Sequence, residues 1–213
     1  MTPAPTLAEQ LAAWSDRLRG ITALGLNFCE NFYDRENYRR VQDIAIEMLA
    51  AATGDPPAEI ERLRAPIFDR PTPLAVGDAA VINDAGEILL IRRADNGQWA
   101  MPGGALEVGE TPAEGVAREA LEESGVRCEP VSLVGVYDSR LSGSTSRHHL
   151  YQFVFLCRPN GGQLGAGSHA IEITDVGWFA ENALPEGLGP SHARRIPDAF
   201  AAWRGAQAAC FDR

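Results

Sequence analysis

Residues 104–126 have the sequence GALEVGETPAEGVAREALEESGV, and this stretch decides how the rest of the chain is interpreted. It predicts a loop that leads into one short, very acidic helix. Thr111 suits the N-cap, Pro112 suits the first helical position, and Glu114 stands three residues after the cap; together they form a capping box with the favoured proline. Gly125 follows the last residue of the helical pattern and suits a left-handed C-terminal cap.

Three glutamates of this predicted helix, Glu119, Glu122 and Glu123, stand at the spacing i, i+3 and i+4. At about 100° per residue they share one helix face, where like charges repel one another at a cost of about 0.2–0.5 kcal/mol per pair. A solvated acidic face is the ordinary interpretation of this pattern. The Pro-Gly-Gly sequence at 102–104 favours a ligand site instead, because a glycine backbone can approach a ligand closely. The side of the helix that faces a core is expected to carry Ala113, Ala117, Ala120 and Leu121.

The composition restricts the class of protein. Of 213 residues, 45% are apolar and 23% are charged, which is ordinary for a soluble globular protein and allows a sizeable core. The net charge of −10 argues against a broad nucleic-acid-binding face, so no DNA partner is expected. The four cysteines lack metal-binding spacing, and no signal peptide or long apolar run is recognisable. These features predict a cytoplasmic protein without a membrane partner.

The acidic helix belongs to a longer spaced pattern, G-x5-E-x7-R-E-U-x-E-E-x-G-U, in which U is an apolar residue. Its specified positions are filled by Gly104, Glu110, Arg118, Glu119, Ala120, Glu122, Glu123, Gly125 and Val126. With this complete pattern the chain resembles the Nudix hydrolase family, although a larger aliphatic residue is usual at position 120. The sequences GEILLIRR, GQWAMPGG and ITDVGWFAENALPE also resemble parts of that family, so the resemblance covers residues 73–205.

The resemblance implies an α/β fold for residues 73–213, a Nudix α/β/α sandwich with a mixed sheet. Ahead of it, residues 1–54 carry apolar residues at helical spacing, and we expect two or three short helices with a break at Gly20. This segment resembles the helical domain ahead of Nudix enzymes of the bacterial CDP-choline pyrophosphatase type, where the extra domain helps to build a dimer. We therefore expect a homodimer through the N-terminal helices. Residues 55–72, rich in proline, are predicted to be a linker with a short helical piece around Glu59 to Arg64.

By the resemblance, Glu119, Glu122 and Glu123 are the catalytic carboxylates and metal ligands, and the carbonyl of Gly104 is a further ligand. Mg²⁺ prefers hard oxygen ligands of this kind, and Mn²⁺ could substitute for it. A bound divalent ion acts as Lewis acid, template and activator of water. The general base is left open by the pattern, with Glu119 and Glu123 as the first candidates.

The remaining positions of the pattern have structural roles in the family. Glu110 and Arg118 are expected to form an ion pair that holds the loop to the helix, although Arg118 can also pair with Glu114 or Glu122, each one turn away. Gly104 and Gly125 complete the structural part of the pattern.

Other charged residues are weaker candidates for the site. Arg92 and Arg93 end a predicted strand and point to opposite faces, so at most one of them reaches the site. We predict Arg93 as the contact to a substrate phosphate. Glu172 and Asp175 stand near a late strand, and either could supply a further carboxylate or the base.

The resemblance implies a Mg²⁺-dependent pyrophosphatase that cleaves a nucleoside diphosphate linked to a second moiety, giving a nucleoside monophosphate and a phosphorylated product. CDP-choline or another CDP-alcohol is the first expected substrate because of the N-terminal segment, and ADP-ribose is the second. Hydrolysis of nucleoside triphosphates or RNA ends is an alternative. A non-catalytic nucleotide sensor is an alternative from another class, disfavoured because every glutamate of the pattern is present.

Overall fold

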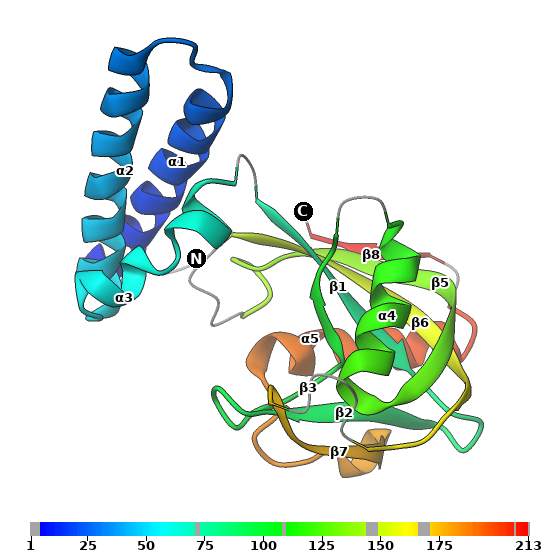
Figure 1. Cartoon of the computed structure of the whole chain (residues 1–213). Helices are drawn as coiled ribbons and strands as arrows, with labels where there is room; N and C mark the ends of the chain where they lie inside the picture. The colour runs from blue at the N-terminus through cyan, green and yellow to red at the C-terminus, as the bar shows by residue number, and fades with distance from the viewer. Residues whose placement is uncertain are drawn as a thin grey trace. The chain divides into compact units, whose positions relative to one another are not determined.

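The computed structural model describes residues 5–70, 73–107, 110–143, 149–165, 171–206 and 208–212. The chain divides into two compact units, a helical unit within Met1–Leu74 and an α/β unit that begins at Ala75 (Figure 1). Each unit has its own hydrophobic core. Among the described residues, no helix combines the length and the apolar character needed to cross a membrane.

The helical unit is built on two long helices, α1 (Leu7–Phe28) and α2 (Phe32–Thr53), that pack side by side (Figure 1). A capping box formed by Thr6 and Glu9 starts α1, and Gly54, in the left-handed conformation with φ 76°, ends α2. The predicted break at Gly20 is wrong, because α1 continues through it. A single glycine costs a helix only about 1 kcal/mol relative to alanine, and burial of the neighbouring turns outweighs that cost.

The described part of the predicted linker, residues 55–70, contributes to the core of the helical unit. It forms a short helix, α3 (Pro57–Glu61), and a π-helical turn, η1 (Arg64–Phe68). Ile60 and Phe68 are almost fully buried and pack against α2 on Ala45, Ile46, Leu49 and Ala50. Two helices alone leave their apolar stripes partly exposed, and these two side chains cover that surface on α2.

The described strands of the α/β unit form two sheets. A five-stranded mixed sheet has the order β4-β1-β6-β5-β8, with β5 and β8 parallel, and an antiparallel sheet has the order β3-β2-β7. The strands are β1 (Leu74–Val81), β2 (Glu87–Arg93), β3 (Trp99–Ala100), β4 (Gly103–Ala105), β5 (Val126–Asp138), β6 (Leu150–Gly162), β7 (Ile173–Ala180) and β8 (Cys210–Phe211). The helices are α4 (Pro112–Ser124) and α5 (Pro190–Trp203), and the 3-10 turn η2 (Glu181–Ala183) follows β7.

Successive side chains along β1 point to opposite faces of the sheet, and this alternation creates the layers of the α/β unit. Ala79 and Val81 belong to a buried cluster with Val116 and Ala120 of α4. Ala80 and Ile82 point to the other face of the strand, into a cluster with α5, whose contributors are Ile196, Ala199 and Phe200. The sheet is therefore covered by α4 on one side and α5 on the other (Figure 1), which confirms the predicted α/β/α sandwich.

The caps predicted for α4 are confirmed, and its buried face is shifted from the predicted one. Thr111 and Glu114 form the capping box, and Gly125 adopts the left-handed conformation with φ 71°. Leu121, expected in the core, is 40% exposed, whereas Val116 is fully buried. The buried stripe follows positions 116, 119, 120 and 123, so two of the three glutamates lie at the edge of the core.

Candidate active site

A pocket of about 560 Å³ lies where four elements of the α/β unit meet. It is lined by the end of β2, by β4, by α4 and by the residues that lead into β7. Glu119 and Glu123 contribute the carboxylates from α4, and Gly103 and Gly104 contribute main-chain groups from β4. The predicted glutamate-rich helix and the Pro-Gly-Gly loop before it therefore meet at one cavity.

Glu123 is only 7% exposed, and its carboxylate accepts a hydrogen bond of 2.7 Å from the main-chain N–H of Gly103. Burial raises the pKa of Glu123 to about 8, and the nearby carboxylates of Glu119 and Asp78 act in the same direction. The Gly103 N–H opposes this shift. A divalent cation beside Glu123 would relieve the same excess of negative charge.

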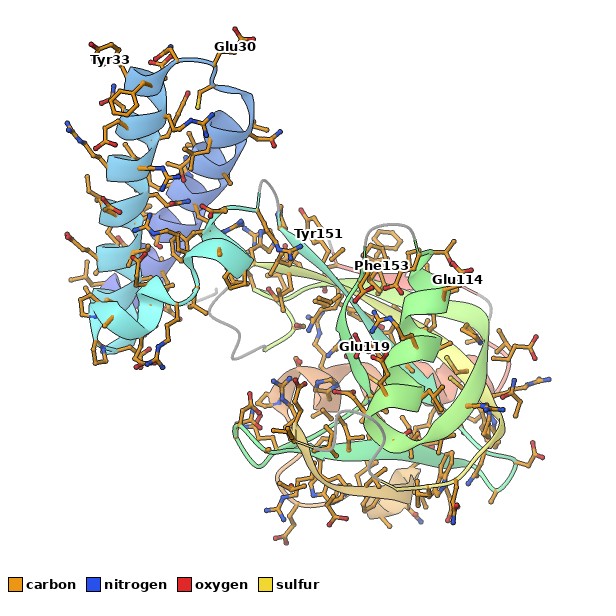
Figure 2. The ribbon with its side chains drawn as sticks, viewed as in Figure 1. Glu30, Tyr33, Glu114, Glu119, Tyr151 and Phe153 are labelled. Carbon is orange, nitrogen blue, oxygen red and sulfur yellow. The ribbon has the colours of Figure 1, made fainter. Side chains whose placement is uncertain are left out.

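The carboxylate of Glu119 lies in close contact with Gly104. A Cβ on Gly104 would lie 2.6 Å from Oε1 of Glu119, so the carboxylate packs directly against the glycine backbone. Gly104 is held in this position by antiparallel pairing with Gly77 of β1. The close approach brings the side chain of Glu119, labelled in Figure 2 on α4, against the strand that lines the pocket.

Arg118 connects the loop that holds Glu110 to the acidic helix α4, as the resemblance implies. Its Nε and Nη2 donate to the two carboxylate oxygens of Glu110 over 3.0 and 2.9 Å. This bidentate pair, with help from the N–H of Glu107, lowers the pKa of Glu110 to about 2. The remaining guanidinium nitrogen, Nη1, donates to Glu119 over 2.9 Å and to Glu122 over 3.0 Å.

Arg118 also bridges two of the carboxylates that the sequence puts on one face. Glu122 does not line the pocket, and its Oε2 accepts a hydrogen bond from Nη1 of Arg118, which also donates to Glu119. Within the described part of the chain, no three Asp, Glu, His or Cys side chains stand together as a complete metal cage. The hard oxygens of Glu119 and Glu123 fit Mg²⁺ at the pocket, and Glu122 could join them once it exchanges its contact with Arg118.

The two arginines at the end of β2 have different surroundings, as their alternation predicts. Arg93 lines the pocket and forms a bidentate ion pair with Asp95, with distances of 3.0 and 2.8 Å. Asp95 raises the pKa of Arg93, and so keeps its charge fixed. Arg92 donates instead to a main-chain carbonyl outside the pocket. Of the two late acidic candidates, Glu172 lines the pocket and Asp175 does not.

Sequence reasoning missed a buried polar cluster behind the pocket. Arg195 of α5 is fully buried and forms an ion pair with Asp78 of β1, and His192 lies beside them. A signal was present in the sequence, because Asp78 is the only charged residue in the apolar run 74–82. A charge inside a strand buried on both faces requires a partner.

Comparison with known families identifies the chain. Residues 71–199 match the NUDIX domain, and residues 9–63 match the UDP-X-like, N-terminal oligomerisation domain. The chain therefore belongs to the Nudix hydrolase family, and the interpretation of residues 104–126 as a Nudix box is confirmed. Membership of this family makes it a hydrolase, and the N-terminal helices match a domain type named for oligomerisation.

Several relatives cover much of the chain. A MutT-like protein of Streptomyces ambofaciens is 42% identical over 120 residues, which are 56% of this chain and 72% of that protein. The putative ADP-ribose pyrophosphatase YjhB of Bacillus subtilis is 35% identical over 172 residues, 80% of this chain and 81% of the relative. Among solved structures, a UDP-X diphosphatase is similar with a TM-score of 0.58 and 28% identity, covering 96% of this chain and 99% of the other.

Proposed function

We propose that this protein is a divalent-metal-dependent pyrophosphatase that hydrolyses a nucleoside diphosphate linked to a second moiety. The products are a nucleoside monophosphate and a phosphorylated second product. The observation that carries this proposal is the composition of one pocket wall. The carboxylates of Glu119 and Glu123 and the guanidinium of Arg93 line the same cavity, which suits metal ions and a diphosphate together.

The residues in and beside the pocket have distinct proposed roles. Glu119, Glu122, Glu123 and the carbonyl of Gly104 hold Mg²⁺, with Mn²⁺ as a substitute. The bound ion supplies Lewis acidity and lowers the pKa of a water molecule. Gly103 fixes the orientation of the Glu123 carboxylate through its N–H.

Arg118, itself held by Glu110, fixes the orientation of the Glu119 carboxylate. Arg93 binds the diphosphate. The general base is one of the carboxylates at the pocket, where Glu172 joins Glu119 and Glu123 as a candidate.

The substrate is defined by its nucleobase and by the second moiety that is linked to the diphosphate. The likeness to a UDP-X diphosphatase along 96% of the chain, N-terminal helices included, favours pyrimidine nucleoside diphosphates linked to a sugar or an alcohol. CDP-choline and other CDP-alcohols, which the sequence suggests first, belong to this class. ADP-ribose is the second candidate, supported by the name of the Bacillus subtilis relative. Nucleoside triphosphates, RNA ends and a purely nucleotide-sensing role are the remaining alternatives, and a cytoplasmic location stays a prediction.

One experiment separates these alternatives. The purified chain is incubated with Mg²⁺ and, in turn, a UDP-sugar, CDP-choline, ADP-ribose, a nucleoside triphosphate and a triphosphate-ended RNA, and the nucleotide products are resolved by chromatography. We expect UMP or CMP as the main product, and much less from the variant Glu123→Gln. Tight binding of a nucleotide with no turnover of any compound would establish the sensor and contradict the proposal.

We further propose that the protein is a homodimer joined through α1. Three apolar side chains on this helix, Leu7, Trp14 and Ile21, are spaced by seven residues and are 67%, 45% and 60% exposed. A spacing of seven residues places them in one line along the helix. Such a line of exposed apolar groups is unusual on an isolated surface, and the match to an oligomerisation domain supports a second copy as its partner.

The dimer proposal is tested by the mass in solution. At micromolar concentration, light scattering should give twice 23.0 kDa for the natural chain and 23.0 kDa for the double variant Trp14→Asp, Ile21→Asp. Tyr33→Asp is the matched control, because Tyr33 is also exposed but belongs to α2. A monomeric natural chain, or an equal effect of the control, would contradict the proposal.

A further inference from the structure

Helix α5 lies on the opposite side of the sheet from α4, yet it sends a buried cationic side chain toward the active site. Arg195 is fully buried, and its Nη1 donates to Oδ2 of Asp78 on β1. Two further donors are used within α5: Nε donates to the carbonyl of Ser191 over 3.0 Å, and Nη2 donates to the Ser191 hydroxyl over 3.1 Å. The guanidinium therefore has a fixed orientation that points it at Asp78.

His192 provides a second connection from the same helix. Its Nδ1 accepts a hydrogen bond of 3.3 Å from the main-chain N–H of Met101. The same nitrogen lies 3.4 Å from Nη2 of Arg195 and 4.0 Å from Oδ1 of Asp78. Because Nδ1 accepts from Met101, it carries no proton, and the neutral ring is held with its acceptor toward the loop.

Both connections lead to the short segment 101–103 that fixes Glu123, one directly at Met101 and the other through Asp78, which pairs with Gly103. Met101 begins this segment, and Gly103, at its end, pairs with Asp78 across β1 and β4. A Cβ on Gly103 would lie 2.9 Å from the Cα and 3.0 Å from Oδ1 of Asp78, so the carboxylate packs directly against this glycine. Between them, the carbonyl of Pro102 accepts from the N–H of Ala79 over 2.8 Å.

The position of the segment decides the position of a pocket carboxylate. Gly103 donates its N–H to Oε2 of Glu123, and no flexible side chain intervenes. A buried ion pair adds little net stability compared with apolar side chains of similar size. The ion pair of Arg195 and Asp78 therefore contributes more to the local geometry than to the stability of the fold.

We propose that Arg195, Asp78 and His192 are positioning residues, through which α5 holds segment 101–103 so that the Gly103 N–H keeps the Glu123 carboxylate in its working orientation. The inference rests on the proposed function, since it assigns these residues to the pyrophosphatase reaction. They do not touch the substrate. Their loss lowers kcat by misplacing Glu123 and leaves the substrate contact at Arg93 unchanged.

Two variants of His192 test the proposal. The amide oxygen of the variant His192→Asn occupies the place of Nδ1 and can accept from Met101, whereas His192→Leu cannot. We expect His192→Leu to lower kcat about tenfold, the equivalent of one hydrogen bond, with KM changed less than twofold. His192→Asn should restore kcat to within about twofold of the natural chain. Hydrogen exchange at the Gly103 amide, followed by NMR without substrate, should be faster in the Leu variant only.

The exchange measurement separates this inference from the proposed function. Should the natural chain hydrolyse none of the tested compounds, the proposed function fails, while the Gly103 amide still reports whether His192 orders the segment. Should the natural chain be active and both variants match it in kcat and exchange, the positioning role is overturned. Equal losses of kcat in both variants, with unchanged exchange at Gly103, overturn it as well.

A second variant addresses the ion pair itself. The double substitution Asp78→Asn, Arg195→Met removes both buried charges together, which avoids leaving either one unpaired. We expect a folded protein whose kcat falls at least tenfold with faster exchange at Gly103. A folded double variant with natural kcat would overturn the role of Arg195 and Asp78.

Discussion

The guanidinium of Arg93 and the carboxylate of Asp95 form a bidentate ion pair at the wall of the pocket that Glu119 and Glu123 also line. Both side chains are about half exposed, so a pair of this kind is worth only about 0.2–1 kcal/mol. A phosphate that binds Arg93 competes with Asp95 for the same donors. The carboxylate of Asp95 therefore competes weakly with the substrate phosphate for Arg93.

Asp95→Asn should consequently lower KM by about two- to fivefold and leave kcat unchanged, because it weakens the competitor only in the free enzyme. Arg93→Gln is the matched variant and should raise KM. Initial rates over a range of substrate concentrations measure both. An increase of KM in Asp95→Asn would show that Asp95 helps to bind the substrate, contrary to this interpretation.

Among the proposed metal ligands, Glu122 differs from Glu119 and Glu123 because it lies outside the pocket lining and accepts a hydrogen bond from Arg118. If it joins the metal during the reaction, Glu122→Gln should lower Mg²⁺-dependent turnover by about 100-fold or more. Its side chain is partly exposed, so the melting temperature should change little. The control is Glu129→Gln, an exposed glutamate of β5 outside the pocket. Unchanged turnover in Glu122→Gln would remove it from the ligand set.

The contrast between Glu122 and Glu123 shows how far the sequence could predict the site. Caps and helical period are local properties, so Thr111, Glu114 and Gly125 were predictable from neighbours within four residues. The same period put three glutamates on one face. It could not predict that one nitrogen of Arg118, held by Glu110 eight residues earlier, would donate to both Glu119 and Glu122, or that Glu122 would lie outside the pocket.

Local sequence patterns could not predict the ion pair between Arg195 of α5 and Asp78 either, and for a different reason. Asp78 and Arg195 are 117 residues apart, and only the completed sheet brings their side chains together. The continuation of α1 through Gly20 has a similar cause, because helix propensity is a weak preference that tertiary packing overrides. In the predicted linker a short helical piece was expected, but the proline content hid the buried positions of Ile60 and Phe68.

The neutral state of His192 makes the stability of the protein depend on pH. Burial is the main cause that lowers its pKa to about 4; Asp78 opposes the shift, and Arg195 and Arg93 reinforce it. In the unfolded chain a histidine has a pKa of about 6.5. Between these two values the unfolded state binds more protons, so this contribution is complete above pH 6.5 and is lost as the pH falls toward 4.

By pH 4.5 the loss should reach about 2–3 kcal/mol in the free energy of unfolding, measured by urea denaturation at pH 7.0, 5.5 and 4.5. Carboxylates also titrate in this range, so the useful quantity is the difference between the natural chain and His192→Asn. That difference should shrink steadily as the pH falls. A difference independent of pH would mean that His192 does not titrate with a lowered pKa.

Gly104 offers the sharpest test of the pocket geometry. In Gly104→Ala the new methyl group would lie 2.6 Å from Oε1 of Glu119, so the carboxylate or strand β4 must move. A displacement of about 1 Å at a reacting group can cost 100-fold in rate, and we expect kcat to fall by about this factor. Circular dichroism should show the secondary structure retained.

The matched control for this prediction is Gly20→Ala, in the middle of α1, where a Cβ meets no atom within 4 Å. This substitution should leave kcat unchanged and stabilise the helical unit by up to about 1 kcal/mol, because alanine is the better helix former. Together the two variants separate the loss of backbone freedom from the collision with Glu119. If Gly104→Ala retained natural turnover, the close packing of Glu119 on β4 could not be part of the working site.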